Sequence, residues 1–381
     1  LRAKRSNRSP WDCFASLATT GFGSFIFWNT LKTSDLYIKA NSESFLNRNY
    51  RAMGLLIGLC YDLKTDYLKA GFSASEVMEF DDEETIIWLE DALFQLGHQV
   101  ERIGNGRELA LCLVKGDRWD LVFNIAEGLK GRSREAQVPA VCELFAQPYT
   151  FSDPLTCALT LDKALAKRVV RDRGLPTAPF EVVNTTAEAT AASLPMPVFL
   201  KPVAEGSSKG VTGRSLVKER EELVSTYQVL RELFQQSVLV ETFLPGREVT
   251  VGIIGNGSNS HVVGVMEVIL TGKTEAFAYT TLNKDEYLER VSYDLLIDPE
   301  PLAAQARQLA LDVYHTLGCR DAARVDLRCD ASGVLQFMEV NPLPGLHYIR
   351  SDLVIMGRLG GVTYTEIIAE IVESAWQRYK C

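Results

Sequence analysis

Residues 322–345 read AARVDLRCDASGVLQFMEVNPLPG, and this stretch decides most of what the sequence says about fold and chemistry. Two apolar runs flank the turn at Asp330–Gly333, so the pattern predicts two strands, Ala322–Arg328 and Leu335–Val340, joined as a hairpin. Successive side chains of a strand point to opposite faces, so alternate polar residues of each strand share a face.

The polar residues of this hairpin are of the kinds that bind a divalent cation. Arg324 and Asp326 share one face of the first strand. Glu339 and Asn341 share one face of the second. If the two faces coincide, two carboxylates and an amide oxygen converge, which are the hard ligands that Mg²⁺ prefers, with nucleotide phosphates completing the octahedron. The alternative is a solvated hairpin face with one salt bridge. The turn-rich segment Asn341–Gly345, which follows the second strand directly, favours a binding site over a plain hairpin, because loops beside rigid strands often carry function.

Length and composition restrict the class of protein. The 381 residues exceed a typical single domain, so we expect two or three packed units. Hydrophobic residues make up 46% and charged residues 23%, and no stretch after Met53 is apolar enough to span a membrane. A net charge of -9 argues against a nucleic-acid partner. Eight scattered cysteines without a C-x-x-C pair predict reduced thiols in a cytoplasmic protein.

Residues 1–52 differ from the rest of the chain. Four basic residues precede the short apolar stretch Phe14–Trp28, an arrangement that resembles an export or transit signal. Glycine and hydroxyl residues interrupt that stretch, and no small-residue cleavage site follows it. Because Met53 directly precedes a strand pattern, we expect residues 1–52 to be a disordered or non-native extension.

The segment 53–162 alternates strands with helices. Such alternation predicts a parallel sheet with helices on its faces. The expected elements are a strand at Gly54–Tyr61, a helix at Thr85–Leu96, a strand at Gln99–Ile103, a helix at Gly106–Val114 and a strand at Asp120–Asn124.

The pattern changes after Pro148, where strand-like runs begin to dominate. A helix at Asp162–Arg173, closed by Gly174, opens this part of the chain. Further helices are expected at Glu219–Phe234, Pro301–Leu317 and Tyr364–Tyr379, and further strands at Pro197–Pro202, Val238–Phe243, Val249–Gly255 and Val262–Leu270.

Two other stretches are candidates for nucleotide binding. Lys201 ends the run VFLK and precedes the Gly/Ser-rich loop Ala204–Gly210, whose backbone N–H groups could surround phosphates; the alternative is a plain turn. The strand that contains Glu241 ends before a Pro-Gly turn and Glu248. Its backbone could meet an adenine edge, and either acid could bind ribose hydroxyls or be only a surface charge. Lys163, at the opening of its helix, could equally be a solvated side chain.

These motifs, in this order, resemble the ATP-grasp superfamily and, within it, the D-alanine–D-alanine ligases. The resemblance implies an α/β ATP-grasp fold: a Rossmann-like parallel α/β unit at 53–162, then two α+β units at 163–248 and 249–381 that enclose ATP. The motifs that carry it are PYTFSDPLTCALTLDK at 148–163, LKPVAEGSSKG at 200–210, VETFLPGREVTV at 240–251, and RVDLRCDASG with FMEVNPLPGL between 324 and 346.

The resemblance also implies roles for individual residues. The ATP-binding residues would be Lys163, Lys201, Ser207 and Ser208 at the phosphates, Glu241 and Leu244 on the adenine side, and Glu248 at the ribose. Asp326, Glu339 and Asn341 would hold two Mg²⁺ ions, or Mn²⁺ in their place. Arg324 and the backbone N–H of Gly345 would stabilise the oxyanion, Ser207 would lie near the first substrate, and Lys284 would belong to a lid loop.

The sequence departs from the family pattern where the amino-acid substrates should bind. Cys60–Lys64 replaces the family's Gly-Gly-x-Ser-x-Glu loop, with Glu76 and Glu79 as candidate replacements for its glutamate. The family's His-Gly motif is replaced by Asn124–Gly128, which makes Glu127 a candidate substrate residue. Ser351 is a candidate for the carboxylate of the second substrate.

The resemblance implies a ligase that activates a carboxylate as an acyl phosphate, with D-alanyl-D-alanine for peptidoglycan as the expected product. Amino acids would be its small-molecule substrates, and a homodimer through the N-terminal unit is plausible by the resemblance. One alternative is an ATP-grasp ligase for other amino acids or a secondary-metabolite acid. Another is a nucleotide-binding protein without ligase activity.

Overall fold

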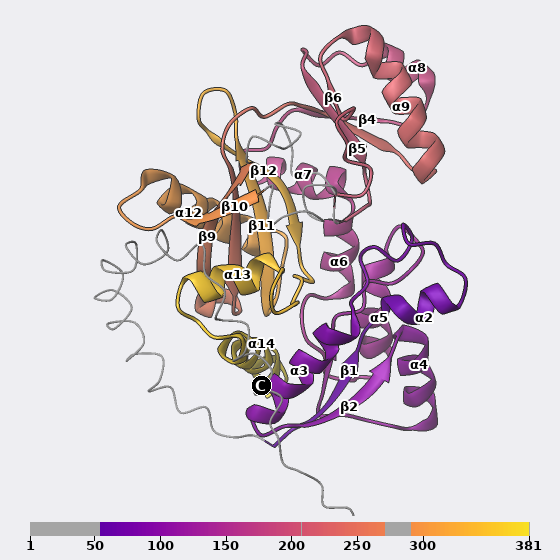
Figure 1. The fold of residues 1–381 in the computed structure, drawn as a ribbon, viewed down its shortest axis with the longest axis vertical. Helices are drawn as coiled ribbons and strands as arrows, with labels where there is room; N and C mark the ends of the chain where they lie inside the picture. Colours follow the sequence, from indigo (N-terminus) through magenta and orange to yellow (C-terminus); the bar gives the residue numbers. More distant parts are fainter. Residues whose placement is uncertain (1–53, 207, 271–290, 381) are drawn as a thin grey trace, which may run out of the picture. The chain divides into compact units, whose positions relative to one another are not determined.

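The computed structural model describes residues 54–206, 208–270 and 291–380 (Figure 1). Contacts divide the chain into the units 1–51 and 52–381, and all described residues belong to the second unit. Within the described part the strands form three sheets. One sheet is parallel and two are antiparallel, which agrees with the change of pattern after Pro148.

The first sheet is parallel, as predicted, with the order β2-β1-β3. Its strands are β1 (Leu56–Cys60), β2 (Gln99–Gly104) and β3 (Leu121–Asn124). Helices cover both faces of this sheet: α3 (Glu83–Gln95) and α14 (Tyr364–Tyr379) share a core with one face, and α4 (Gly106–Lys115) and α5 (Gln137–Leu144) share a core with the other.

The side chains of β1 explain why this strand is apolar along its whole length. Ile57 and Leu59 point into the core shared with α3, whereas Cys60 lies in the core shared with α4. Gly58 lies between them, and a Cβ there would come within 2.4 Å of the Ile103 side chain on β2. The strand therefore needs apolar residues on both faces and a glycine at the tightest contact.

The second sheet is antiparallel, with the order β4-β7-β5-β6. The helices α8 (Thr186–Ala191) and α9 (Arg220–Phe234) share an apolar core with it and cover one of its faces (Figure 1). The sequence patterns did not predict β4 or α8, which are short. The strands are β4 (Phe180–Val183), β5 (Val198–Pro202), β6 (Leu216–Val217) and β7 (Val238–Thr242).

The third sheet is antiparallel and contains the predicted hairpin of residues 322–341. Its order is β10-β9-β8-β11-β12. One core joins it to α7 (Lys163–Asp172) and α12 (Pro301–Thr316), and a smaller cluster joins it to α13 (Asp352–Leu359). The strands are β8 (Glu248–Ile254), β9 (His261–Leu270), β10 (Val291–Leu295), β11 (Ala322–Cys329) and β12 (Leu335–Asn341).

The remaining elements connect these layers. They are α2 (Lys64–Lys69), α6 (Pro154–Leu161) and the 3₁₀ turns η2 (Arg134–Ala136) and η3 (Gly257–Asn259). In the last helix, α14, Arg378 donates to Asp321 at 2.6 Å and to the Tyr149 carbonyl at 2.8 Å. Asp321 directly precedes β11, and Tyr149 lies in the segment after the first sheet, so Arg378 connects the third sheet with that segment.

Composition predicted no membrane span after Met53 and reduced cysteines. No helix in the described ranges is long and apolar enough to cross a membrane. The cysteines that the structure describes are free thiols, five of them buried, as expected: Cys60, Cys112, Cys142, Cys157, Cys319 and Cys329.

Candidate active site

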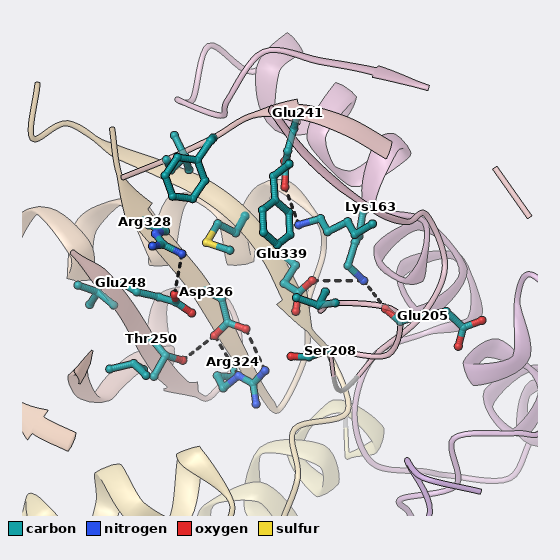
Figure 2. Close-up of a pocket in the computed structure, with 18 of the residues that line it drawn as sticks. Lys163, Glu205, Ser208, Glu241, Glu248, Thr250, Arg324, Asp326, Arg328 and Glu339 are labelled. Atoms are coloured by element: carbon teal, nitrogen blue, oxygen red, sulfur yellow. Dashed lines mark hydrogen bonds and ion pairs between the residues drawn. The ribbon is translucent and has the colours of Figure 1, made fainter. Parts of the chain in front are cut away.

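A cavity bordered by β5, β7, β8, β11, β12 and the Gly/Ser-rich loop gathers most of the predicted site residues (Figure 2). Its wall contains both charged and apolar side chains, and Phe199, Phe243 and Met338 are among the apolar ones. The predicted residues that line it are Lys163, Lys201, Ser208, Glu241, Leu244, Glu248, Arg324, Asp326 and Glu339.

The two polar faces of the hairpin coincide, as the metal-site hypothesis required. Arg324 pairs with Asn341 across the strands, and Asp326 pairs with Glu339. The Asn341 amide nitrogen donates to Asp326 at 3.3 Å. Since amide oxygen and nitrogen have nearly the same shape, a half-turn of this amide would present its oxygen to the same point.

A bulge in the hairpin puts two neighbouring residues of β12 into the wall of the cavity. The pairing shifts after Asp326, because Leu327 lies opposite Phe337 and leaves Met338 as an extra residue on β12. Phe337 is therefore buried in the core while Met338 and Glu339 both line the cavity.

Asp326 is held in place by its neighbours. Arg324 donates to both carboxylate oxygens, at 3.0 and 2.9 Å, and the Thr250 hydroxyl donates at 2.6 Å. Arg324 also donates to Asp352, at 2.9 Å. Burial disfavours the charge of Arg324, but Asp326 and Asp352 outweigh it and hold the pKa of the guanidinium above its usual value. Arg324 therefore stays a fixed cation beside the predicted metal ligands Asp326, Glu339 and Asn341, which we call the donor set.

Lys163 connects the helix α7 to the donor set. Its ammonium lies 3.2 Å from a carboxylate oxygen of Glu339 and donates to the Glu205 carbonyl of the Gly/Ser-rich loop. The residue is only 8% exposed, so the alternative of a solvated helix residue is wrong. A cation at this position faces both the metal donors and the loop that could hold phosphates.

Glu241 is buried between two lysines. Lys201 lies 2.8 Å from one carboxylate oxygen and Lys167 lies 2.9 Å from the other. Burial alone would raise the pKa of Glu241, but the two lysines lower it to about 2. Glu241 is 5% exposed, which rules out the alternative of a surface charge. Sequence patterns did not single out Lys167: its four-residue spacing from Lys163 puts both on one face of a helix but does not show that Lys167 is buried.

Glu248 forms an ion pair with Arg328 at 3.1 Å, and both line the cavity. The Arg328 guanidinium also lies 5.5 Å from the centre of the Phe243 ring, where a cation and an aromatic face attract. Arg328 was missed as well, although it continues the alternation of Arg324 and Asp326 on the polar face of β11.

Side chains from the first part of the chain hold the Gly/Ser-rich loop. The Gly206 N–H donates to Glu79 at 2.7 Å, and Arg134 donates to the Ala204 carbonyl at 2.9 Å. Arg134 also donates to both carboxylate oxygens of Glu79, at 3.2 and 2.9 Å. Glu79, a candidate for binding the ammonium of the first substrate, is thus engaged by the loop and by Arg134. The other candidate, Glu76, is exposed and accepts from Ser73 at 2.9 Å.

Two further acids of this region, Glu127 and Glu135, form what we call the acid pair. Burial raises the pKa of both carboxyls, and the negative charge of Glu79 adds to this effect. The charge of Glu135 also raises the pKa of Glu127. The pKa of Glu135 rises to about 7, and Arg134 only partly offsets the effect. The predicted substrate residue Glu127 thus belongs to a group of acids in which burial and neighbouring negative charge favour the protonated form.

The remaining predicted residues lie elsewhere. Gly345 and Ser351 are neighbours, since a Cβ on Gly345 would be 2.8 Å from the Ser351 hydroxyl, which also accepts from the His347 N–H at 2.8 Å. Neither these two residues nor Glu127 lines the cavity. Ser207 and Lys284 fall outside the described residues.

The donor set fits a divalent cation that also binds a nucleotide. Among the described residues no group of three or more His, Cys, Asp or Glu side chains could hold a metal by itself. Asp326, Glu339 and Asn341 offer two carboxylates and one amide, which is typical of a Mg²⁺ site that takes its other ligands from phosphates and water.

Known proteins resemble this chain over most of its length. A family model described as "D-ala D-ala ligase C-terminus" matches residues 169–373. An uncharacterized protein, y4sG, of Sinorhizobium fredii is 36% identical over 262 residues, which cover 68% of this chain and 75% of that protein. The D-alanine–D-alanine ligase of Bordetella petrii is 31% identical over 74% of this chain and 84% of its own length.

A solved structure agrees in fold. The D-alanine–D-alanine ligase of Bacillus anthracis, complexed with ATP, aligns with a TM-score of 0.64 and 19% identity over 86% of this chain and 99% of that one. The fold class predicted from the sequence, ATP-grasp, is therefore confirmed. With the family model, the relatives and the cavity in agreement, this chain belongs to the D-alanine–D-alanine ligase family.

Proposed function

We propose that this protein is an ATP- and Mg²⁺-dependent ligase that joins two molecules of D-alanine. The observation that carries the proposal is the pairing of Asp326 with Glu339 across the hairpin, with Lys163 and Lys201 on the same cavity. The family, whose named members include D-alanine–D-alanine ligases, supports this choice of substrate.

The cations of the cavity would bind and orient ATP. Lys163 and Lys201 would contact its phosphates, together with the Gly/Ser-rich loop that contains Ser208. Glu248 would accept hydrogen bonds from the ribose hydroxyls. Because two lysines occupy the Glu241 carboxylate, we assign the adenine edge to the backbone beyond β7, near Leu244.

Asp326, Glu339 and Asn341 would hold Mg²⁺, or Mn²⁺, in two positions. The bound ions would neutralise charge on the transferring phosphoryl group. The Lys163 ion pair with Glu339 would keep the phosphate-binding cation beside these donors. Arg324, fixed by Asp326 and Asp352, would keep its charge throughout turnover.

The reaction would take place in two steps. A carboxylate oxygen of the first D-alanine attacks the γ-phosphorus of ATP, the bond to the bridging oxygen breaks, and ADP leaves. The amine of the second D-alanine then attacks the acyl phosphate carbon and loses a proton, and inorganic phosphate leaves. We assign Arg324 and the Gly345 N–H to the oxyanion of the tetrahedral intermediate, since donors in fixed positions stabilise developing charge. Ser351, beside Gly345, would bind the carboxylate of the second substrate, and Lys284 and Ser207 keep their expected roles in the lid and near the first substrate.

A second candidate is a ligase for other amino acids or for a secondary-metabolite acid. The acid pair favours it, because Glu127 lies in Asn124–Gly128, the segment that replaces the family's His-Gly motif, and Glu135 follows shortly after it in the sequence. Two carboxyls with raised pKa values present a different environment to an amino-acid ammonium group than an imidazole does.

The test is a ligase assay on the full 381-residue chain with ATP, Mg²⁺ and a panel of D- and L-amino acids, singly and in pairs. ADP release that needs D-alanine alone, with a dipeptide product by mass spectrometry, is the expected result. Turnover with other amino acids but not with D-alanine would overturn the proposed substrate and support the second candidate.

A third possibility, nucleotide binding without catalysis, has its own outcome in the same assay. It requires ATP binding that survives Asp326→Ala and Glu339→Ala, with no turnover by the parent protein anywhere in the panel.

We further propose a cytoplasmic homodimer that binds neither nucleic acid nor membranes. The free thiols of the described part support a reducing compartment. Sedimentation analysis of the full chain tests the dimer, and a monomer at every concentration would contradict it. For the chain as a whole we propose the boundaries 53–162, 163–248 and 249–381.

A further inference from the structure

Lys167 lies behind the wall of the cavity and does not line it, yet it contacts a residue that does. Its side chain is fully buried, with 0% exposed. Its ammonium lies 2.9 Å from Glu241 and donates at 3.0 Å to both the Thr177 hydroxyl and the Phe337 carbonyl. The proposed mechanism gives this lysine no part, although a buried lysine is costly and needs compensation.

Lys167, Glu241 and Lys201 together form what we call the buried triad. They come from α7, β7 and β5, and all three are 5% exposed or less. The triad contains two cations and one anion, so its formal charge is positive. Lys201 and Glu241 line the cavity, whereas Lys167 binds the far oxygen of Glu241.

The position of Glu241 raises an electrostatic problem for a phosphate site. An acid 2.8 Å from Lys201 would cancel most of the field of that lysine and would also repel an incoming phosphate. A second cation on the other carboxylate oxygen offsets this repulsion. The distances of the two lysines from Glu241 are nearly equal, so the acid is shared between them.

We infer that Lys167 is a positioning residue for ATP, which neutralises Glu241 so that the charge of Lys201 remains available to the nucleotide phosphates. This inference rests on the proposed ATP site. Glu339 and Glu248 are the other acids whose negative charge reaches Lys201, and Glu339 also reaches Lys167. Both belong to the cavity and are present with or without Lys167.

A purely structural role makes different predictions, which allows a double-mutant test. Lys167→Met leaves a Lys201–Glu241 pair that is neutral overall. Adding Glu241→Gln to it restores the positive charge of the site, because only Lys201 then remains charged. The electrostatic role therefore predicts that the second change rescues ATP binding, whereas a structural role predicts that the two losses add.

The experiment is calorimetric titration of the full-length protein with ATP in the presence of Mg²⁺, and with adenosine as the ligand without phosphates. We expect Lys167→Met to weaken ATP binding on the order of tenfold, with adenosine binding unchanged, and the double variant to recover most of that loss. Thr177→Val is the matched control, since it removes a neutral hydrogen-bond partner of Lys167 and should leave ATP affinity within about twofold.

Several outcomes would overturn the inference. Equal losses for ATP and adenosine, or additive losses in the double variant, would show that Lys167 only maintains the fold. Unchanged ATP affinity in Lys167→Met would show that Lys167 has no effect on ATP binding, and this too would overturn the inference. If Lys167→Met does not fold, Glu241→Gln alone decides: tighter ATP binding than in the parent supports the electrostatic role and weaker binding contradicts it. Failure of the parent protein to bind ATP is a separate result, which would count against the proposed function.

Discussion

The cavity and the region around the acid pair both contain several carboxylates, but the acid pair itself, unlike the acids of the cavity, is governed mainly by burial. In the cavity, cations bind the acids directly. These pairs are Asp326 with Arg324, Glu339 with Lys163, Glu241 with Lys167 and Lys201, and Glu248 with Arg328. In the other region Arg134 binds Glu79 through both carboxylate oxygens, and the pKa values of Glu127 and Glu135 are raised by burial.

The difference shows how one chain can serve two kinds of ligand. Carboxylates in contact with fixed cations suit metal ions, and the cations themselves attract a polyanionic nucleotide. A carboxyl that changes protonation near neutral pH responds instead to whatever charge approaches it, for example the ammonium group of an amino acid. The two regions should therefore respond differently to the same isosteric change from glutamate to glutamine.

The largest effect is expected for Glu339→Gln. This change removes a metal donor and the partner of Lys163 at once, so we expect kcat/KM for ADP release to fall by more than about 100-fold. Glu232→Gln, the same substitution on an exposed position of α9, is the control and should keep the parent rate. Equal activities of the two variants would mean that the hairpin is not the metal site.

An intermediate effect, in stability and not in rate, is expected for Glu135→Gln. The folded pKa of Glu135, about 7, lies above its ordinary value of 4.5, so the folded state binds the proton more tightly than the unfolded state does. The parent protein therefore loses stability as pH rises from about 4.5 through 7, whereas the glutamine variant has no such loss at this position. At pH 8 the variant should be more stable by up to about 3 kcal/mol, and near pH 4.5 the difference should vanish.

Urea unfolding at pH 5 and pH 8 measures this difference in the free energy of unfolding. The matched control is Glu76→Gln, because Glu76 is an exposed acid in the segment after α2 whose pKa is lowered by hydrogen bonds from Ser73. A stability difference between Glu135→Gln and the parent that does not change with pH would show that Glu135 is ionised in the fold throughout this range.

The smallest effect is expected for Glu127→Gln. If Glu127 contacts the first substrate, its neutralisation should change KM for that amino acid on the order of tenfold and leave KM for ATP unchanged. Initial rates with each substrate varied in turn measure both constants. A change in KM for ATP with none for the amino acid would remove the distinction between the two regions.

The hairpin shows what could be predicted from the sequence. The period of two along β11 and β12 placed Asp326 and Glu339 correctly, because strand alternation is a local property. The parallel first sheet and the antiparallel sheets that follow also agree with the sequence patterns. The short elements β4, α8 and α13 were missed, since each offers only one or two turns or a few residues of pattern.

Lys167 and Arg134 show what could not be predicted. A lysine or an arginine in a sequence is presumed exposed, and only the fold reveals that each is buried. Their partners are distant in sequence: Lys167 contacts Phe337, and Arg134 contacts Ala204. The sequence thus identified most of the charged residues that face the cavity, though not Arg328, and missed the buried cations that contact them from behind.

The extra residue in β12 has a consequence for anyone who recombines this chain with its relatives. Upstream of Met338 the strand presents Phe337 to the core, and downstream it presents Glu339 to the cavity, so the bulge separates two phases of alternation. Deleting Met338 would remove the bulge and leave one regular alternation, with Phe337 still facing the core and Glu339 the cavity, but the cavity wall would lose the Met338 side chain and the local bend of the strand. A chimera that exchanges this hairpin should therefore be joined outside residues 322–341, so that the spacing of the segment is inherited whole.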